Sequence, residues 1–346
     1  MKRNEKLKKA GLLFLSFCMF LVCSGLLYVT RMAGMIHMYT GPETEAAMIN
    51  TNLNEETSKK LKDYWTVALF GTDSRREDMT DDPANSDTII LCTIERESGE
   101  VRLVSVARDL YVMGGSGEAA FHKVTQSYFK GGPVQMVSDL NQNMDLQIDD
   151  FIACNWKAVA QTINILGGID LEITDEEFYY LNSFITETVK TTGIGSNHLK
   201  KGGWNHLDGV QAVAYCRLRL MDNDLKRTER QRKVISLTLD KMKEAGWPAI
   251  NQILETVLPQ IETTISPQQL ADMGKKADHF NIVESQVFPF QYQEALLGKK
   301  GNVLVPNTLE KNVEKLHSIL YEDTSYQCTD KVRRISRGIL RSAVHN

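Results

Sequence analysis

Residues 64–75, YWTVALFGTDSR, and residues 85–112, NSDTIILCTIERESGEVRLVSVARDLYV, decide the fold of this 346-residue chain. The turn-prone residues 96–99 (RESG) separate two apolar runs, so the strands on either side are expected to form an antiparallel hairpin. β-Branched and aromatic residues predict strands over residues 64–70, 89–94 and 101–106.

Farther along the chain, apolar residues recur with helical and strand periods in alternation. We expect helices over residues 133–143, 156–166, 207–216, 227–245 and 309–320, and strands over residues 148–154 and 169–173. This alternation predicts an α/β fold in which a central mixed β-sheet is flanked by helices.

Residues 10–30, AGLLFLSFCMFLVCSGLLYVT, carry no charged side chain. A helix of this length spans a hydrocarbon core of about 30 Å. Five basic residues precede the segment and only Arg31 follows it closely, which keeps the N-terminus cytoplasmic and sends the rest of the chain outward. We therefore predict a single-pass type II membrane protein. A cleaved signal peptide is the alternative, disfavoured by the long apolar run and the lack of an A-x-A site.

The chain then divides into segments of different character. Residues 31–62 are polar and contain Gly41-Pro42, which is typical of a spacer that is partly helical. The expected segments are a cytoplasmic tail (1–9), a transmembrane helix (10–30), an extracellular spacer (31–62), a folded extracellular domain (63–322) and a basic C-terminal tail (323–346).

Composition excludes several classes of protein. A net charge of -4 and a pI near 6.0 argue against a nucleic-acid binder, so no nucleic-acid partner is expected. Four cysteines lie beyond residue 30 without CxxC or Cys/His spacing, which disfavours a zinc site. Buried thiols are expected, and one disulfide among Cys92, Cys154, Cys216 and Cys328 remains open.

Two acidic residues lie where predicted strands end or begin. Asp73 follows the first strand in GTDSR, and Asp87 precedes the second in NSDT. Each alone is typical of a turn. A pair of carboxylates also suits a hard divalent cation, which prefers oxygen ligands. The sequence therefore predicts a metal site at Asp73 and Asp87.

Arginines accompany these acids, and guanidinium groups bind phosphate oxygens in bidentate fashion. Antiparallel pairing of the hairpin strands would bring Arg108 toward Asp87, where the alternative is a simple surface ion pair. Arg217 and Arg219, at i and i+2, would point the same way in an extended chain.

A second basic group follows. The helical period places Arg227, Arg230 and Gln231 on one face, where a solvated basic surface is the alternative. Converging arginines need an anionic partner. Together with the two acids, they predict a metal-assisted site for a phosphate-rich substrate.

Seven stretches follow one another along the chain: VALFGTDSR (67–75), NSDTIILCTI (85–94), VRLVSVARDLYV (101–112), YFKGGP (128–133), INILGGIDLEI (163–173), LDGVQAVAYCRLR (207–219) and NDLKRTERQRKV (223–234). In this order they resemble the LytR-CpsA-Psr family of cell-wall glycopolymer transferases. The likeness extends from about Trp65 to Lys243. It departs at Ala107, where the family usually has Pro, and at residues 223–226 (NDLK), where the family usually has Gly-Asp-Phe-Gly.

The resemblance implies a single α/β domain on a type II anchor in a bacterial membrane. It implies transfer of a glycopolymer, such as teichoic acid or capsule, from an undecaprenyl-pyrophosphate carrier to peptidoglycan, with formation of a phosphodiester. Mg²⁺ or Mn²⁺ would be held by Asp73 and Asp87. Asp73, Asp87, Arg108 and Arg219 would be catalytic, and the expected pyrophosphate-binding residues are Arg75, Arg108, Arg217, Arg219, Arg227, Arg230 and Gln231.

Two other functions remain open. A non-catalytic scaffold that binds polyprenyl phosphate would use the same arginines. A transcriptional regulator is disfavoured by the outward topology and by the absence of a basic helix-turn-helix pattern. For the transferase, Asp87 is the first candidate for the general base and Asp224 the second.

Overall fold

A computed structural model describes residues 30–31, 34–35, 37–72, 85–115, 120–219, 224–266, 269 and 279–344. The predicted membrane segment lies outside these residues except for Thr30, as do Asp73, Arg75 and the side chain of Asp224. Within the described ranges, no helix is both long enough and apolar enough to span a bilayer.

Among the described residues, seven strands form one mixed sheet, as the sequence predicted. β2 pairs antiparallel with β3 and parallel with β7, and β4 pairs antiparallel with β3 and parallel with β11. In spatial order the strands are β1 (His37–Met38), β10 (Ile261–Thr263), β7 (Asp150–Asn155), β2 (Tyr64–Thr72), β3 (Ser86–Glu95), β4 (Glu100–Val106) and β11 (Asn281–Phe288).

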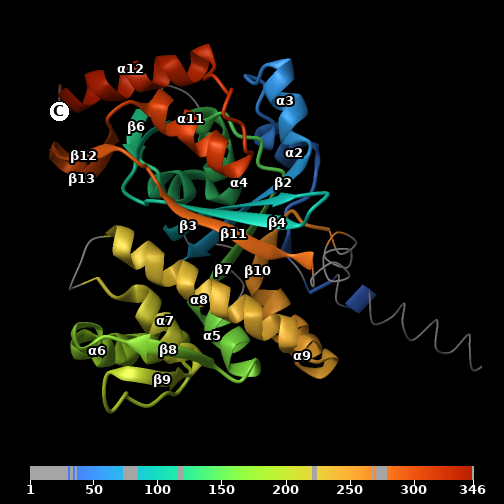
Figure 1. Cartoon of the computed structure of the whole chain (residues 1–346), viewed down its shortest axis with the longest axis vertical. Coiled ribbons are helices and arrows are strands. Elements are labelled where there is room, and N and C mark those ends of the chain that lie inside the picture. Colours follow the sequence, from blue (N-terminus) through green and yellow to red (C-terminus); the bar gives the residue numbers. More distant parts are fainter. Residues whose placement is uncertain are drawn as a thin grey trace, which may run out of the picture.

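Helices cover both faces of the sheet (Figure 1). The upper group in that view comprises α2 (Pro42–Met48), α3 (Glu55–Leu61), α4 (Thr125–Met144), α11 (Leu309–Leu320) and α12 (Asp330–Val344). The lower group comprises α5 (Trp156–Ile165), α6 (Asp175–Thr192), α7 (Gly209–Arg217), α8 (Asp224–Glu244) and α9 (Trp247–Val257).

Three two-stranded antiparallel sheets complete the described fold. They are β5 (Tyr111–Gly114) with β6 (Ala120–Lys123), β8 (Ile169–Ile173) with β9 (Gly203–Leu207), and β12 (Tyr292–Leu297) with β13 (Gly301–Pro306). The 3-10 turns Leu258–Gln260 and Gly298–Lys300 lead into β10 and β13.

Alternate side chains of the central strands are buried on opposite faces of the sheet, and on the lower face Ile90, Ile94 and Leu103 form a cluster with Ile235 of α8. Phe70, Leu91 and Val104 are buried in the upper core, together with residues of α4 and α11. A separate lower core is built from α5, α6, α7 and the paired strands β8 and β9, and it includes Tyr215 and Leu218. Burial of alternate residues fits the period of a sheet covered on both faces.

The two ends of the domain differ from simple linker and tail. The segment predicted as a spacer contains α2 and α3, whose Met48 and Leu61 are buried in the upper core. The basic segment 323–346 contains α12, whose Val332 and Ile339 are buried in the same core. Apolar residues at helical spacing thus fold α12 onto the domain while its basic residues face outward.

One predicted helix begins earlier in the chain than expected. A start at Pro133 fits a helix with Pro in its first turn, but α4 already begins at Thr125. Gly131 and Gly132 are non-helical, and Gly132 has φ 67°, so the helix is kinked there and resumes at Pro133. The four described cysteines are free thiols, so none of them forms a disulfide with another.

Candidate functional site

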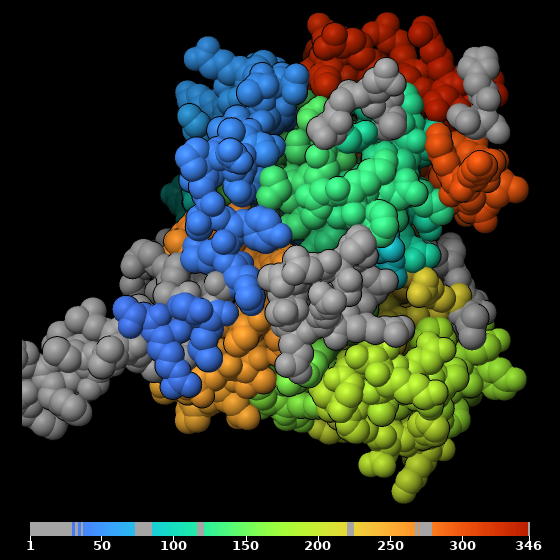
Figure 2. Space-filling model, turned by 180° about the vertical axis from the view of Figure 1, so that it is seen from behind, coloured from blue at the N-terminus to red at the C-terminus, as the bar shows by residue number. Residues whose placement is uncertain are grey.

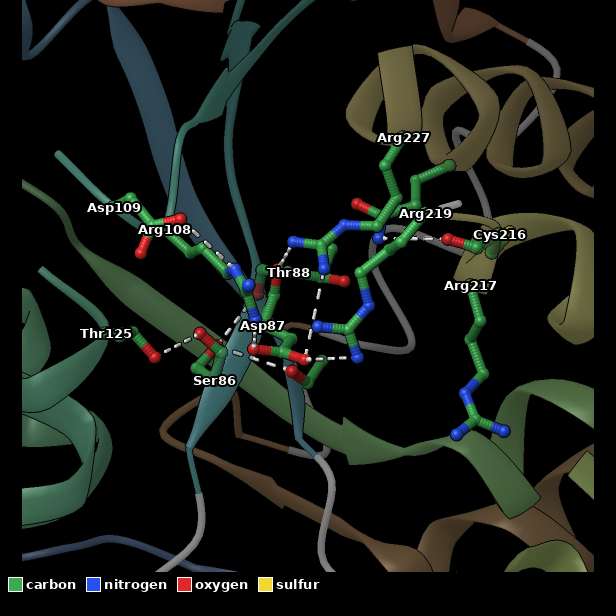
Figure 3. A network of polar contacts seen from close by, with 12 residues as sticks. Ser86, Asp87, Thr88, Arg108, Asp109, Thr125, Cys216, Arg217, Arg219 and Arg227 are labelled. Atoms are coloured by element: carbon green, nitrogen blue, oxygen red, sulfur yellow. Dashed lines mark hydrogen bonds and ion pairs between the residues drawn. The ribbon is translucent and has the colours of Figure 1, made fainter. Parts of the chain in front are cut away.

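The polar cluster lies at the end of the β2–β3 strand pair where β2 ends and β3 begins (Figure 3). Thr72, the last described residue of β2, pairs with Ser86, the neighbour of Asp87. Thr125, at the start of α4, donates a hydrogen bond to the Ser86 carbonyl over 2.9 Å. The first residues of β3 are therefore fixed between β2 and α4.

Asp87 is the centre of the cluster. Arg108 Nη1 donates a hydrogen bond to Asp87 Oδ1 over 2.8 Å, which confirms that the β3–β4 hairpin brings these residues together. Arg219 Nη2 and Arg227 Nη1 lie 3.9 and 4.0 Å from its Oδ2. Arg227 Nη2 also donates to the Asp87 carbonyl over 3.0 Å. One guanidinium of α8 thus contacts both the backbone and the carboxylate of β3.

The charges set the ionisation of Asp87. Burial alone would raise the pKa of its carboxyl. The charge and hydrogen bond of Arg108, with the charges of Arg227 and Arg219, outweigh that effect and hold the pKa below its ordinary value. Asp87 is therefore ionised at neutral pH.

Positive charge exceeds negative charge among these described groups. Three guanidiniums face one carboxylate, so 3 - 1 leaves a charge of about +2. Arg227 is only 2% exposed, and a buried cation is costly unless anions compensate it. The cluster is thus suited to a ligand with more than one negative charge, and a diphosphate has this property.

A cavity of about 160 Å³ opens at this cluster. Its lining residues are Asp87, Trp156, Thr191, Cys216, Arg217, Arg219, Arg227 and Gln231. A larger groove of about 1170 Å³ lies at the opposite end of the β2–β3 strand pair, beside Trp65 and Glu95. We place the site at the smaller cavity because the converging arginines lie there.

Arg217 and Arg219 diverge, contrary to the expectation from an extended chain (Figure 3). Arg217 is the last residue of α7, and its Nη1 donates to Thr188 Oγ1 of α6 over 2.8 Å. Arg219 follows the extended Leu218 (ψ 127°) and turns toward Asp87. Helical geometry at Arg217 replaces the i, i+2 relation of a strand.

The three residues of α8 that were expected to share one face make different contacts. Arg227 faces Asp87, whereas Arg230 Nη2 donates to the Leu218 carbonyl over 2.8 Å and its Nη1 lies 3.9 Å from Glu177 of α6. Gln231 is buried and lines the cavity, with Nε2 3.5 Å from the Cys216 carbonyl. The described contacts of Arg230 thus lie with α6 and the end of α7.

A second layer of charge, not predicted from the sequence, lies behind Arg108. Asp109 Oδ2 lies 3.6 Å from Arg108 Nε, and its Oδ1 lies 2.7 Å from Lys123 Nζ. Lys123 ends β6, just before α4. Its signal in the sequence, a lysine between a short strand and a helix, is too common to single out. The structure therefore adds Lys123 to the surroundings of the site.

The described part of the site contains one of the two predicted metal ligands, Asp87. Within the described ranges, no group of three or more His, Cys, Asp or Glu side chains could hold a metal ion. Asp87 supplies hard oxygen atoms, and its expected partner Asp73 lies outside the described residues. The carboxylate oxygens of Asp87 are of the type that a hard cation prefers. The pairing of Asp73 with Asp87 at a metal ion stays a prediction.

Comparisons with known proteins agree with one another. A family model described as the LytR_cpsA_psr family matches residues 34–320. TagT of Bacillus subtilis, named a polyisoprenyl-teichoic acid–peptidoglycan teichoic acid transferase, is 27% identical over 308 residues, which cover 85% of this chain and 90% of TagT. TagV of the same organism, with the same transferase name, is 25% identical over 288 residues, or 80% of this chain and 68% of TagV.

Solved structures share the fold. TagT bound to LIIa-WTA superposes with a TM-score of 0.55 at 20% identity and covers 86% of this chain and 95% of its own. Protein gbs0355 from Streptococcus agalactiae superposes with a TM-score of 0.61 at 20% identity, covering 80% of this chain and 94% of its own. At this identity the likeness concerns the fold alone.

Proposed function

The chain belongs to the LytR-CpsA-Psr family, and on that premise we propose that it transfers a glycopolymer from an undecaprenyl-pyrophosphate carrier to peptidoglycan. It would act as a single-pass type II membrane protein with its folded domain outside. The observation that carries the proposal is the group of three guanidiniums around one partly buried carboxylate. The names of TagT and TagV support a transfer reaction of this class.

In this reaction a peptidoglycan hydroxyl attacks the phosphorus that bears the glycopolymer. A new O–P bond forms, the bond to the carrier phosphate breaks, and undecaprenyl phosphate leaves with the electron pair. Arg108, Arg219 and Arg227 stabilise negative charge on the transferring and leaving groups. Fixed guanidiniums need little rearrangement to do so.

The hydroxyl proton passes to a carboxylate, and Asp87 is our candidate for this base. Its lowered pKa would make it a weak base in the free protein. A bound diphosphate brings negative charge beside it, which raises its pKa toward the range of an effective base. Binding of the diphosphate donor would therefore activate the carboxylate that accepts the proton of the peptidoglycan hydroxyl.

Asp73 and Asp87 would hold a divalent cation, for which Mg²⁺ is the expected ion. Bound there, the cation neutralises charge on the diphosphate and polarises its oxygens. The arginines remain responsible for orienting the diphosphate, because their forks fix two oxygens at once.

The test uses the full chain in detergent, a lipid-pyrophosphate-linked glycan, peptidoglycan fragments and Mg²⁺. Mass spectrometry should detect a phosphodiester-linked product with the unaltered protein and none with Asp87→Asn. Asp170→Asn is the matched control, since Asp170 is exposed on β8 beside His206. Bound lipid without product from the unaltered protein would instead support the scaffold function.

A further inference from the structure

A line of basic side chains leads from the candidate site to the C-terminal helix. It starts at Lys123, whose ammonium lies 2.7 Å from Asp109, the neighbour of Arg108. An ideal Cβ at Gly301 would lie 3.9 Å from the same Nζ, so the turn before β13 lies against Lys123. Leu304 of β13 donates its N–H to the Asp109 carbonyl over 2.9 Å, which holds the β12–β13 hairpin beside the site.

Tyr111 links this turn to α12. It pairs with Lys123 across the β5–β6 hairpin. Its hydroxyl accepts a hydrogen bond from Lys300 Nζ over 2.6 Å and lies 2.8 Å from Ser342 Oγ of α12. Arg341 precedes Ser342 in α12, so the basic residues of the helix begin beside this contact and continue away from the site.

On α12 the basic residues occupy the side opposite the core. Val332, Ile335 and Ile339 are buried, whereas Arg333, Arg337 and Arg341 are exposed and repeat every four residues. Residues at this spacing lie one above another, roughly 6 Å apart along the axis. Figures 1 and 2 place α12 beside the β12–β13 hairpin on one side of the molecule.

We propose that these residues, the basic track of Lys123, Lys300, Arg341, Arg337 and Arg333, hold the polymer part of a polyanionic glycopolymer whose linking phosphate lies at Asp87. The inference rests on the proposed function and assigns a surface of the protein to the polymer part of its substrate. Five cations on the track contrast with the net charge of -4 of the whole chain. A neutral glycan would gain nothing from such a distribution.

A negatively charged bilayer surface would also attract arginines, but the position of α12 favours the polymer. The chain enters the sheet through β1, at the edge opposite β4 and β11. α12 packs on α4, α11 and the β5 and β13 strands, and α11 contacts β4 and β11. The track is therefore remote from the edge nearest the predicted anchor.

The test measures binding of soluble poly(glycerol phosphate) to the full chain in detergent at several salt concentrations, without any transfer reaction. The track variant combines Arg333→Gln, Arg337→Gln and Arg341→Gln. It should bind about tenfold more weakly, and its slope of log affinity against log salt should fall by roughly 2, as for three lost contacts to a single-stranded polyanion. The corresponding triple Arg→Lys variant keeps the charges and should restore most binding.

The control combines Lys190→Gln, Lys200→Gln and Lys201→Gln, three exposed residues of the lower group. It should bind within about twofold of the unaltered protein, because it removes equal charge elsewhere. Equal binding by the track variant and the unaltered protein would overturn the proposal. So would competition by neutral dextran, or loss of binding to anionic lipid vesicles with polymer binding intact.

The outcome is separable from that of the proposed function. If the unaltered protein binds the polymer through the track but yields no phosphodiester, the transferase proposal fails and the track remains. If transfer occurs, the track further predicts that the ratio of rates for a long anionic donor and a single-repeat donor falls about tenfold in the track variant.

Discussion

Replacing Asp87 by Asn should strengthen the binding of inorganic pyrophosphate when no metal is present, and yet abolish transfer. The unaltered cluster holds three guanidiniums and one carboxylate, a charge of about +2. The variant holds the same guanidiniums without the carboxylate, a charge of about +3. A pyrophosphate anion would then no longer be repelled by Asp87.

The expected size follows from the geometry. The arginines lie 2.8 to 4.0 Å from the carboxylate oxygens, so a phosphate bound to them lies at about 5 Å from that charge. One unit charge at about 5 Å contributes about 3 kcal/mol at an effective dielectric constant near 20. Screening by salt and solvent around the half-exposed Arg219 reduces this to about 1.4 kcal/mol, or about tenfold in affinity.

Titration calorimetry with and without Mg²⁺ provides the assay. Mg²⁺ should strengthen pyrophosphate binding to the unaltered protein but not to Asp87→Asn, because the variant lacks one of the two predicted metal carboxylates. The effect of the substitution on affinity should therefore reverse in sign when Mg²⁺ is added. Asp170→Asn should behave as the unaltered protein. Weaker metal-free binding by a correctly folded Asp87→Asn protein would refute the charge argument.

Three further predictions concern single residues. Arg227→Gln should lower pyrophosphate affinity about 30-fold, or about 2 kcal/mol for a charged hydrogen bond, whereas Arg230→Gln should mainly lower thermal stability; equal losses of affinity would contradict the division of α8. Burial raises the pKa of Glu262 to about 7, so the folded state holds this proton more tightly than the unfolded state. That stabilisation is full at low pH and is lost as pH rises through 7. In denaturant unfolding, the stability of Glu262→Gln relative to the unaltered protein should therefore be about 3 kcal/mol higher at pH 8 than at low pH. Parallel pH profiles of the two proteins would argue against this. In Gly209→Ala a Cβ would lie 1.9 Å from a backbone oxygen of α5, which should cost about 3 kcal/mol in unfolding free energy, whereas Gly195→Ala, with nothing within 4 Å, should be neutral.

The central part of the fold was predictable because its signals are local. The strands β2, β3 and β4 follow from β-branched runs and one turn, and their antiparallel pairing brought Arg108 to Asp87 as expected. α5, α7 and α11 likewise begin and end close to the predicted residues. Local propensity and apolar period agree in each of these elements.

What the sequence could not supply depends on distant contacts. β11 pairs in parallel with β4, just over 180 residues earlier in the chain, and several residues of β11 are exposed, so its apolar pattern is weak. α6 was not predicted, although Thr174 and Glu177 form a capping box at its start. The divergence of Arg217 from Arg219 depends on where α7 ends, a boundary that a pattern locates only within a few residues.

The arginines of the cluster come from both sides of the sheet. Arg108 follows a strand of the upper core, whereas Arg219 follows Leu218 of the lower core. A diphosphate held by both is therefore a tie between the two halves, and its binding energy adds to their cohesion. At a concentration of 100 times the dissociation constant this amounts to about 2.7 kcal/mol. The protein with a bound diphosphate should thus resist proteases better than the ligand-free protein.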